Sequence, residues 1–226
     1  MYRIGEAEVQ RIRKLIQSGR IFRYGHGGEC DQFESDWADH VGAKYARMAR
    51  NGTSAIYTSL VGLGVGPGDQ VIVPAYTYMA TALAVLAAGA IPVIADVDDS
   101  LTLSPDDVER RITSHTKAII PVHMVGLPCD MGRIMRIARK HKLVVVEDAC
   151  QAVGGGYKGK KLGSIGHAGA YSFNFFKNIT CGEGGAFVTN KKAVYDRGSV
   201  AVDCCSFYWN PDQERDELQF AGHNFR

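Results

Sequence analysis

The sequence predicts an α/β fold in three layers, with a mostly parallel sheet and helices on both of its faces. Short apolar runs alternate regularly with helical patterns along the chain, and this alternation is typical of a parallel sheet. The runs consist almost continuously of Val, Ile and Ala, as expected for strands that helices cover on both sides. The 226 residues are 46% hydrophobic and 22% charged, which is enough apolar material for a full core.

The elements can be assigned in order along the chain. Two polar helical stretches come first, near residues 5–18 and 31–41. Five apolar runs then predict strands, at Tyr45–Ala49, Gln70–Pro74, Ile91–Ala95, Ala118–Val122 and Leu143–Glu147. Helical patterns lie between them, near residues 53–63, 78–88, 105–113 and 130–141. Each connection is long enough for the crossover that parallel neighbours require.

The pattern changes after residue 165. Two further strands, His167–Phe173 and Ala186–Thr189, leave no room for a crossover helix between them, so we expect antiparallel neighbours that close an otherwise parallel sheet. Three regions follow from these patterns: an N-terminal helical segment at 1–41, a large α/β domain at 42–200 and an irregular segment at 201–226.

Composition argues against several classes of function. The net charge is +2 and the basic residues are scattered, so no stripe suits the phosphates of a nucleic acid. The six cysteines form no CxxC pair and no metal-ligand spacing with histidine, which argues against zinc and indicates reduced thiols. No apolar run approaches the length of a membrane span and no signal peptide is recognised, so we expect a soluble, cytoplasmic protein.

Residues that directly follow a strand are the first candidates for function, because ligands of open α/β sheets bind at the carboxyl ends of the strands. After the first strand, Thr53 and Ser54 open a helix behind a glycine, where free N–H groups and hydroxyls suit a phosphate. Capping of the helix by either hydroxyl is the alternative. After the second strand, Tyr78 can stack on a flat ligand or simply pack.

A carboxylate follows the most apolar strand, in Val144-Val145-Val146-Glu147-Asp148. An unpaired charge at that position is costly unless a cation meets it, and a protonated pyridine nitrogen is such a cation. Asp148 can equally be a helix cap or an ion-pair partner. His123 also follows a strand, but a lone histidine there is more often structural, and we leave it out of the catalytic set.

Lys177 lies between an aromatic strand and a glycine-rich turn, in Ser172-Phe173-Asn174-Phe175-Phe176-Lys177. An amine becomes nucleophilic near neutral pH when apolar neighbours disfavour its charged form, and the three phenylalanines are expected to form an apolar wall around it. The Ser172 hydroxyl is placed to reach an anion beside the lysine. A solvated lysine in a hairpin turn is the alternative.

Phosphate cradle, stacking aromatic, terminal aspartate and lysine, in this order, describe a site for pyridoxal phosphate. No GxxxxGK[ST] loop, no GxGxxG after the first strand and no GxSxG elbow is present, which argues against nucleotide hydrolases, dehydrogenases and esterases.

At these residues the sequence resembles the DegT/DnrJ/EryC1/StrS family of sugar aminotransferases, within the fold type I pyridoxal-phosphate enzymes. The resemblance runs from about residue 20 onward and covers five motifs, which are Asn51–Ala55, Gly66–Pro74 with Thr77, Gly89–Val93, Glu147–Ala152 and Ser172–Gly185. It implies that residues 42–200 are the large cofactor-binding domain of that fold.

The resemblance also implies roles for individual residues. Lys177 forms the Schiff base with the cofactor and moves the proton between the substrate carbon and the cofactor, while Asp148 keeps the pyridine nitrogen protonated. Gln151 contacts the ring hydroxyl side and Tyr78 stacks on the ring. The phosphate is held by three hydroxyl residues, which are Thr53, Ser54 and Ser172.

The implied reaction is a transamination in two steps. An amino donor, usually glutamate, converts the cofactor to pyridoxamine phosphate, which then aminates a keto sugar. A branch of the family that dehydrates sugars has histidine in place of the lysine, so Lys177 favours the aminotransferases. Asn224 resembles the residue that reaches the phosphate in the neighbouring subunit, which implies a homodimer.

Two questions stay open at the level of the sequence. The keto sugar is either nucleotide-linked or a keto-sugar acid, and segments such as Ile21–Tyr24 and Asn178–Cys181 are similar to members that aminate the acid. Family members continue past the motif that contains Asn224 into a small C-terminal domain. The alternative to an aminotransferase is therefore a truncated, non-catalytic homologue that binds the cofactor or a full-length partner.

Overall fold

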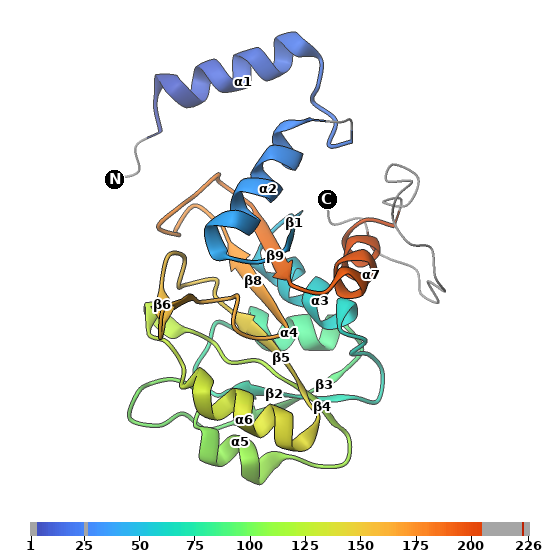
Figure 1. Ribbon diagram of the computed structural model, residues 1–226, viewed down its shortest axis with the longest axis vertical. Coiled ribbons are helices and arrows are strands. Elements are labelled where there is room, and N and C mark those ends of the chain that lie inside the picture. Colours follow the sequence, from blue (N-terminus) through green and yellow to red (C-terminus); the bar gives the residue numbers. More distant parts are fainter. Residues whose placement is uncertain (1–3, 25–26, 205–222, 224–226) are drawn as a thin grey trace.

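The computed structural model describes residues 4–24, 27–204 and 223 (Figure 1). Seven strands of this part form one sheet in the order β1-β9-β8-β5-β4-β2-β3. Their bounds are β1 Tyr45–Ala49, β2 Gln70–Pro74, β3 Ile91–Ala95, β4 Thr116–Ile119, β5 Val144–Asp148, β8 Ala168–Ser172 and β9 Gly185–Thr189. The predicted α/β class with a mostly parallel sheet is confirmed.

Strand β9 is antiparallel to both of its neighbours, β1 and β8, whereas the pairs β8–β5, β5–β4, β4–β2 and β2–β3 are parallel. The predicted antiparallel pairing of the last two strands is confirmed. The antiparallel strand lies inside the sheet, between β1 and β8, rather than at an edge.

Four strands differ from their predicted bounds. β8 is one residue shorter at each end, and β9 begins one residue earlier. β4 was expected at Ala118–Val122 but ends at Ile119, because Pro121 has no N–H and interrupts the ladder. Pairing resumes as a single bridge between Val122 and Asp148, with the Asp148 N–H donating to the Pro121 carbonyl at 2.9 Å. β5 begins one residue later than expected and ends on Asp148 itself.

Helices cover both faces of the sheet. One face packs against α3 (Gly52–Gly62), α4 (Ala80–Ala87) and α7 (Lys192–Val202) through side chains that include Val71 and Val73. Ile72, which lies between these two valines in β2, points to the opposite face. That face packs against α5 (Pro105–Arg111) and α6 (Met131–His141). Toward β9, α2 (Glu29–Val41) covers that same face through Trp37. These three layers are visible in Figure 1.

Helix α1 (Glu6–Ser18) stands apart from the layers and has no buried residue (Figure 1). The side chains of Arg11 and Glu29 link it to α2 by an ion pair of 2.8 Å. None of the helices in the described ranges is both long enough and apolar enough to cross a membrane.

Helix α7 was not predicted, because Gly198 and three valines give its sequence a low intrinsic helix propensity. Tertiary packing forms it instead. A Cβ on Gly62 would lie 2.8 Å from the Val194 carbonyl oxygen, and one on Gly198 would lie 2.6 Å from the Phe187 ring. These two glycines let α3, α7 and β9 approach closely.

Two short elements complete the described structure and were also not predicted. A two-stranded hairpin is formed by β6 (Gly156–Tyr157) and β7 (Lys160–Lys161). A 3-10 turn, η1 (Met124–Gly126), follows β4 and contains Val125 with a positive φ of 47°.

Candidate active site

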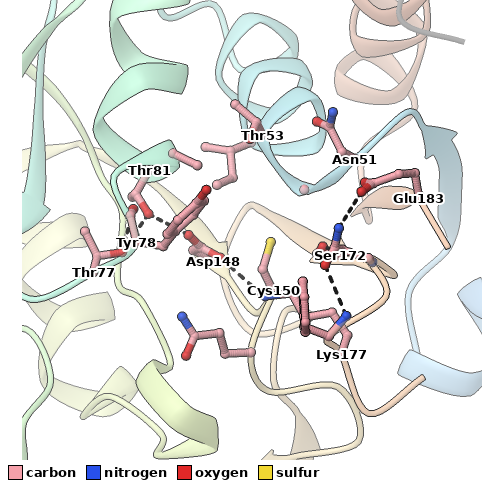
Figure 2. Close-up of a pocket in the computed structure, with 16 residues that line it drawn as sticks. Asn51, Thr53, Thr77, Tyr78, Thr81, Asp148, Cys150, Ser172, Lys177 and Glu183 are labelled. Atoms are coloured by element: carbon pink, nitrogen blue, oxygen red, sulfur yellow. Dashed lines mark hydrogen bonds between the residues drawn. The ribbon is translucent and has the colours of Figure 1, made fainter. Parts of the chain in front are cut away.

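A cavity of about 590 Å³ opens at the edge of the sheet where the parallel strands end (Figure 2). Its walls come from the segments that follow β1, β2, β5 and β8, as expected for an open α/β sheet. The lining residues are Asn51, Gly52, Thr53, Ile56, Thr77, Tyr78, Ala80, Thr81, Asp148, Cys150, Gln151, Ser172, Asn174, Phe176, Lys177 and Glu183. Six of the eight residues predicted for the site are among them.

The N-terminus of α3 forms one wall of this cavity. Asn51 caps the helix, with its Oδ1 accepting the Ser54 N–H at 2.9 Å, so the helix leaves the N–H groups of Gly52 and Thr53 without an intrahelical acceptor. Together with the helix dipole, these groups favour an anion. The Thr53 and Ser172 side chains add hydroxyls to the same wall (Figure 2).

Glycines allow this wall to be compact. A Cβ on Gly52 would lie 2.7 Å from Cys150 Sγ and 2.9 Å from Ser172 Cβ. A Cβ on Gly185, at the start of β9, would lie only 2.4 Å from the Asn51 carbonyl carbon. Both positions therefore need glycine because other segments of the chain pass too close for a side chain.

Ser54 does not line the cavity, which differs from the prediction. Its hydroxyl donates to the Asn51 carbonyl at 2.9 Å and accepts the Asn51 N–H at 3.1 Å. This is a capping box, in which the side chain stabilises the start of the helix. The capping alternative considered from the sequence is thus the observed one for Ser54, with Asn51 as the capping residue.

Asp148 lies at the carboxyl end of β5, and only 5% of it is exposed. Its Oδ1 accepts the Cys150 N–H at 3.1 Å and its Oδ2 accepts the Thr81 hydroxyl at 2.8 Å. These two donors fix the orientation of the carboxylate. Because it also lines the cavity, the carboxylate presents a fixed negative charge to a bound ligand.

The Thr81 hydroxyl belongs to a short chain of hydroxyl groups. Thr77 Oγ1 and Thr81 Oγ1 are 2.7 Å apart, and Thr81 uses its proton for Asp148. Thr77 can therefore donate to Thr81, so that each hydroxyl polarises the next. Both threonines line the cavity, and Thr81, on α4, is almost fully buried.

Cys150 lies between the anion wall and Asp148. Burial, followed by the nearby Asp148 carboxylate, raises the pKa of its thiol well above the usual value. The thiol therefore stays protonated near neutral pH and acts as a small apolar wall rather than a nucleophile.

Lys177 is carried on a turn after β8, with its backbone N–H donating to the Asn174 carbonyl at 2.9 Å. The predicted apolar wall of three phenylalanines is wrong in part. Phe173 is buried in the core against Trp37, and Phe175 does not line the cavity. Only Phe176 lines it, and 83% of that side chain is exposed.

Two further predicted residues lie at the cavity. Tyr78 lines it and is 68% exposed, so its ring is at the mouth and free of core packing. The Gln151 Oε1 accepts the Val125 N–H at 3.1 Å, which leaves the amide nitrogen of Gln151 as its remaining polar group at the cavity. Asn224 lies outside the described residues.

His123 is fully buried behind Asp148 rather than in the cavity, as the structural interpretation predicts. Its Nδ1 accepts the Cys129 N–H at 3.2 Å, and its Nε2 lies 3.0 Å from Glu147 Oε2. Glu147 also accepts backbone N–H groups from Gly163, Ile165 and Gly166. This buried network supports the strand end that carries Asp148.

Sequence reasoning missed Thr81, Asn174 and Glu183. Thr77 lies in the bend before α4 and Thr81 in the first turn of that helix, so helical periodicity does not connect them and the contact between their hydroxyls depends on the shape of the bend. Asn174 and Glu183 meet only because of the way the hairpin pairs its two strands, and the sequence does not reveal that pairing. Within the described ranges, no group of three or more His, Cys, Asp or Glu side chains is arranged to hold a metal ion.

Comparisons with known proteins agree on one family. The sequence model of the DegT/DnrJ/EryC1/StrS aminotransferase family matches residues 2–226. GDP-perosamine synthase of Caulobacter vibrioides is 49% identical over 160 residues, which are 70% of this chain and 43% of that protein. The spore coat polysaccharide biosynthesis protein SpsC of Bacillus subtilis is 40% identical over 195 residues, 86% of this chain and 49% of that protein.

Solved structures give the same result. The aminotransferase from Psychrobacter cryohalolentis matches with a TM-score of 0.88 and 36% identity, covering 99% of this chain and 58% of that one. DesV of S. venezuelae matches with a TM-score of 0.83 and 35% identity, covering 96% and 57%. The chain spans about half the length of the curated relatives it matches. It belongs to the DegT/DnrJ/EryC1/StrS aminotransferase family.

Proposed function

We propose that this protein is part of a pyridoxal-phosphate-dependent aminotransferase that transfers an amino group from an amino acid donor, glutamate, to a keto sugar. The observation that carries the proposal is a single cavity lined by an anion cradle, a buried carboxylate and a lysine. Three solved structures, of two relatives, are described with the pyridoxal or pyridoxamine form of that cofactor.

The chemistry of the donor groups fits pyridoxal phosphate. The N–H groups at the start of α3 and the hydroxyls of Thr53 and Ser172 suit a phosphate. Asp148, held by two donors, suits a protonated ring nitrogen, and Lys177 suits an aldehyde. The cavity of about 590 Å³ is large enough for a cofactor of this size.

Each side chain then has a defined task. Thr53 and Ser172 bind the phosphate, Tyr78 packs on the ring, and Gln151 donates to the ring hydroxyl side. Asp148 holds a proton on the ring nitrogen. When bound, the cofactor supplies an aldehyde that attaches amines and a ring that accepts electrons. The Lys177 amine would move a proton between the substrate carbon and the aldehyde carbon of the cofactor, in one direction in the first half of the reaction and in the other direction in the second.

The acceptor that we propose is a nucleotide-linked keto sugar. Two curated relatives named GDP-perosamine synthase, 49% and 43% identical, support this choice over a keto-sugar acid. We also propose a homodimer in which Asn224 binds the phosphate held by the other subunit. We further propose that residues 1–41, 42–200 and 201–226 form three separate regions. We also propose a cytoplasmic location, where the cysteine thiols stay reduced.

Labelled glutamate and a panel of keto sugars test this function in the full-length protein. We expect transfer of nitrogen to a nucleotide-linked keto sugar, and none in Lys177→Ala. Transfer only to a keto-sugar acid would replace the acceptor but keep the reaction. Cofactor binding without any transfer would favour the non-catalytic alternative.

A further inference from the structure

Lys177 lies between two cavities, so its side-chain amine can point into either of them. The first is the Asp148 cavity described above. The second, which we call the side cavity, has a volume of about 480 Å³. Its lining residues are Val125, Gly126, Gln151, Ala152, Val153, Gly155, Phe176, Lys177 and Asn178. Gln151, Phe176 and Lys177 line both cavities, so the turn that carries Phe176 and Lys177 influences which cavity the amine enters.

Asn174 holds this turn through its backbone and its side chain. Its carbonyl accepts the Lys177 N–H at 2.9 Å, and its Oδ1 accepts the Phe176 N–H at 3.1 Å. Its own N–H donates to Ser172 Oγ at 3.4 Å, on the anion wall. Asn174 thus connects the anion wall to the lysine turn and bonds to two of the three residues that line both cavities.

Glu183 faces Asn174 across a hairpin. The Phe173 N–H donates to the Gly184 carbonyl and the Phe175 N–H donates to the Gly182 carbonyl, both at 2.8 Å. Residues 174 and 183 therefore lie directly opposite each other, where side chains approach most closely. The Asn174 amide nitrogen donates to Glu183 Oε1, and Figure 2 shows Glu183 and Lys177 at opposite ends of this hydrogen-bonded row.

A carboxylate is an unexpected group in the wall of a cavity that favours an anion. Among the residues that the structure describes, no cation pairs with the Glu183 carboxylate, which accepts the Asn174 amide instead. The position of this carboxylate is explained if the free energy gained from its hydrogen bond to Asn174 exceeds the electrostatic repulsion between the carboxylate and a bound anion. A charge-assisted hydrogen bond is about twice as strong as a neutral one.

We propose that Asn174 and Glu183 form a brace that positions Lys177. The brace holds the turn so that the amine points into the Asp148 cavity instead of the side cavity or solvent. Both are positioning residues, since they act through the lysine. The proposal rests on the proposed function for its purpose, but the geometry it describes belongs to the protein without cofactor.

Competitive acetylation with acetic anhydride tests the brace in the cofactor-free, full-length protein. The rate at Lys177, which is half-buried, is compared with that at the exposed Lys160 in the same sample. We expect Glu183→Ala to raise the relative rate at Lys177 about five- to tenfold, because loss of a hydrogen bond to a charged group frees the turn. Glu183→Gln keeps a neutral acceptor for the Asn174 amide, in a bond about half as strong, and should raise the relative rate only about two- to threefold.

Two controls make the result specific. Glu109→Ala removes a carboxylate that pairs with Lys140 and His141 away from the cavity, and it should leave Lys177 unchanged. Asn174→Asp is isosteric and keeps the acceptor for the Phe176 N–H, but it replaces the donor to Glu183 by a second carboxylate, so the hydrogen bond is lost and repulsion is added. It should behave like Glu183→Ala, and it decides the question if Glu183→Ala does not fold.

Wild-type reactivity of Lys177 in both Glu183→Ala and Asn174→Asp would overturn the brace. Equal gains in Glu183→Ala and Glu183→Gln would also overturn it, because charge rather than the hydrogen bond would then be responsible. In the presence of pyridoxal phosphate, the rate of Schiff-base formation at Lys177 should fall about five- to tenfold in Glu183→Ala. Failure of wild type to react with pyridoxal phosphate would count against the proposed function, while the acetylation rates would still decide the brace.

Discussion

Replacement of Thr81 by valine removes one hydroxyl from behind the Asp148 carboxylate and changes little else. Threonine and valine have the same shape, and Thr81 is 1% exposed on α4, so the backbone and packing should persist. The substitution deletes the 2.8 Å hydrogen bond to Asp148 Oδ2, and within the described part of the chain it leaves the Cys150 N–H as the donor to that carboxylate.

The expected size of the effect follows from the kind of bond that is lost. Hydrogen bonds to charged groups contribute about 1.5–3 kcal/mol, and burial prevents water from replacing the donor. If Asp148 holds the ring nitrogen of the cofactor, a misoriented carboxylate should weaken cofactor binding about 10- to 100-fold. Thr77→Val removes the second, more exposed hydroxyl of the chain and should weaken binding only about threefold.

The assay is equilibrium titration of the cofactor-free protein with pyridoxal phosphate, with unfolding midpoints measured in parallel. Thr81→Ser keeps the hydroxyl and should bind within about threefold of wild type. Wild-type affinity in Thr81→Val would refute the reasoning, and so would an equal loss in Thr81→Ser.

Three other substitutions test separate parts of the structure. Gly185→Ala places a Cβ 2.4 Å from the Asn51 carbonyl carbon and should weaken cofactor binding at least about tenfold, whereas Gly5→Ala, with open space around it, should have no effect; equal affinities would be contrary to the packing seen. His123→Ala should lower the unfolding free energy by about 2–4 kcal/mol, because it leaves the buried Glu147 carboxylate without its side-chain partner; a loss below about 1 kcal/mol in denaturant titrations would argue against the pair. A hydrogen bond from Arg111 and one from the Asp96 N–H lower the pKa of Asp107 from 3.8 to about 2, so its stabilisation is present above pH 4 and is lost as the pH falls to about 2. Asp107→Asn should therefore be about 1–2 kcal/mol less stable at pH 7, and a gap that stays constant down to pH 2 would contradict this assignment.

Functional residues that directly follow an apolar run could be predicted from the sequence. Features that depend on how strands and helices pair in space could not. Asp148 was found because an uninterrupted apolar run ends at a charge, and the structure has it as the last residue of β5. β4 was misplaced because the effect of Pro121 on the ladder depends on which neighbour pairs with it. α7 was missed because its packing, and not its propensity, makes it helical.

The candidate site shows the same division. Motifs with local geometry, such as a helix start at Thr53 and a lysine after an aromatic strand, could be read directly. Ser54 was assigned to the ligand because two hydroxyls in one helical turn look alike in sequence, and only the structure shows which one bonds to Asn51. Glu183 faces Asn174 only because the hairpin pairs in one register, so no local pattern identifies it.

The most direct test of the account is reduction of the pyridoxal-phosphate-loaded, full-length protein with borohydride, followed by peptide mapping. A Schiff base reduced at its lysine leaves a stable pyridoxyl adduct that mass spectrometry locates. We predict one adduct, on Lys177, and its loss in Lys177→Ala. No adduct, or an adduct on another lysine that persists in Lys177→Ala, would contradict the assignment of this cavity as the cofactor site.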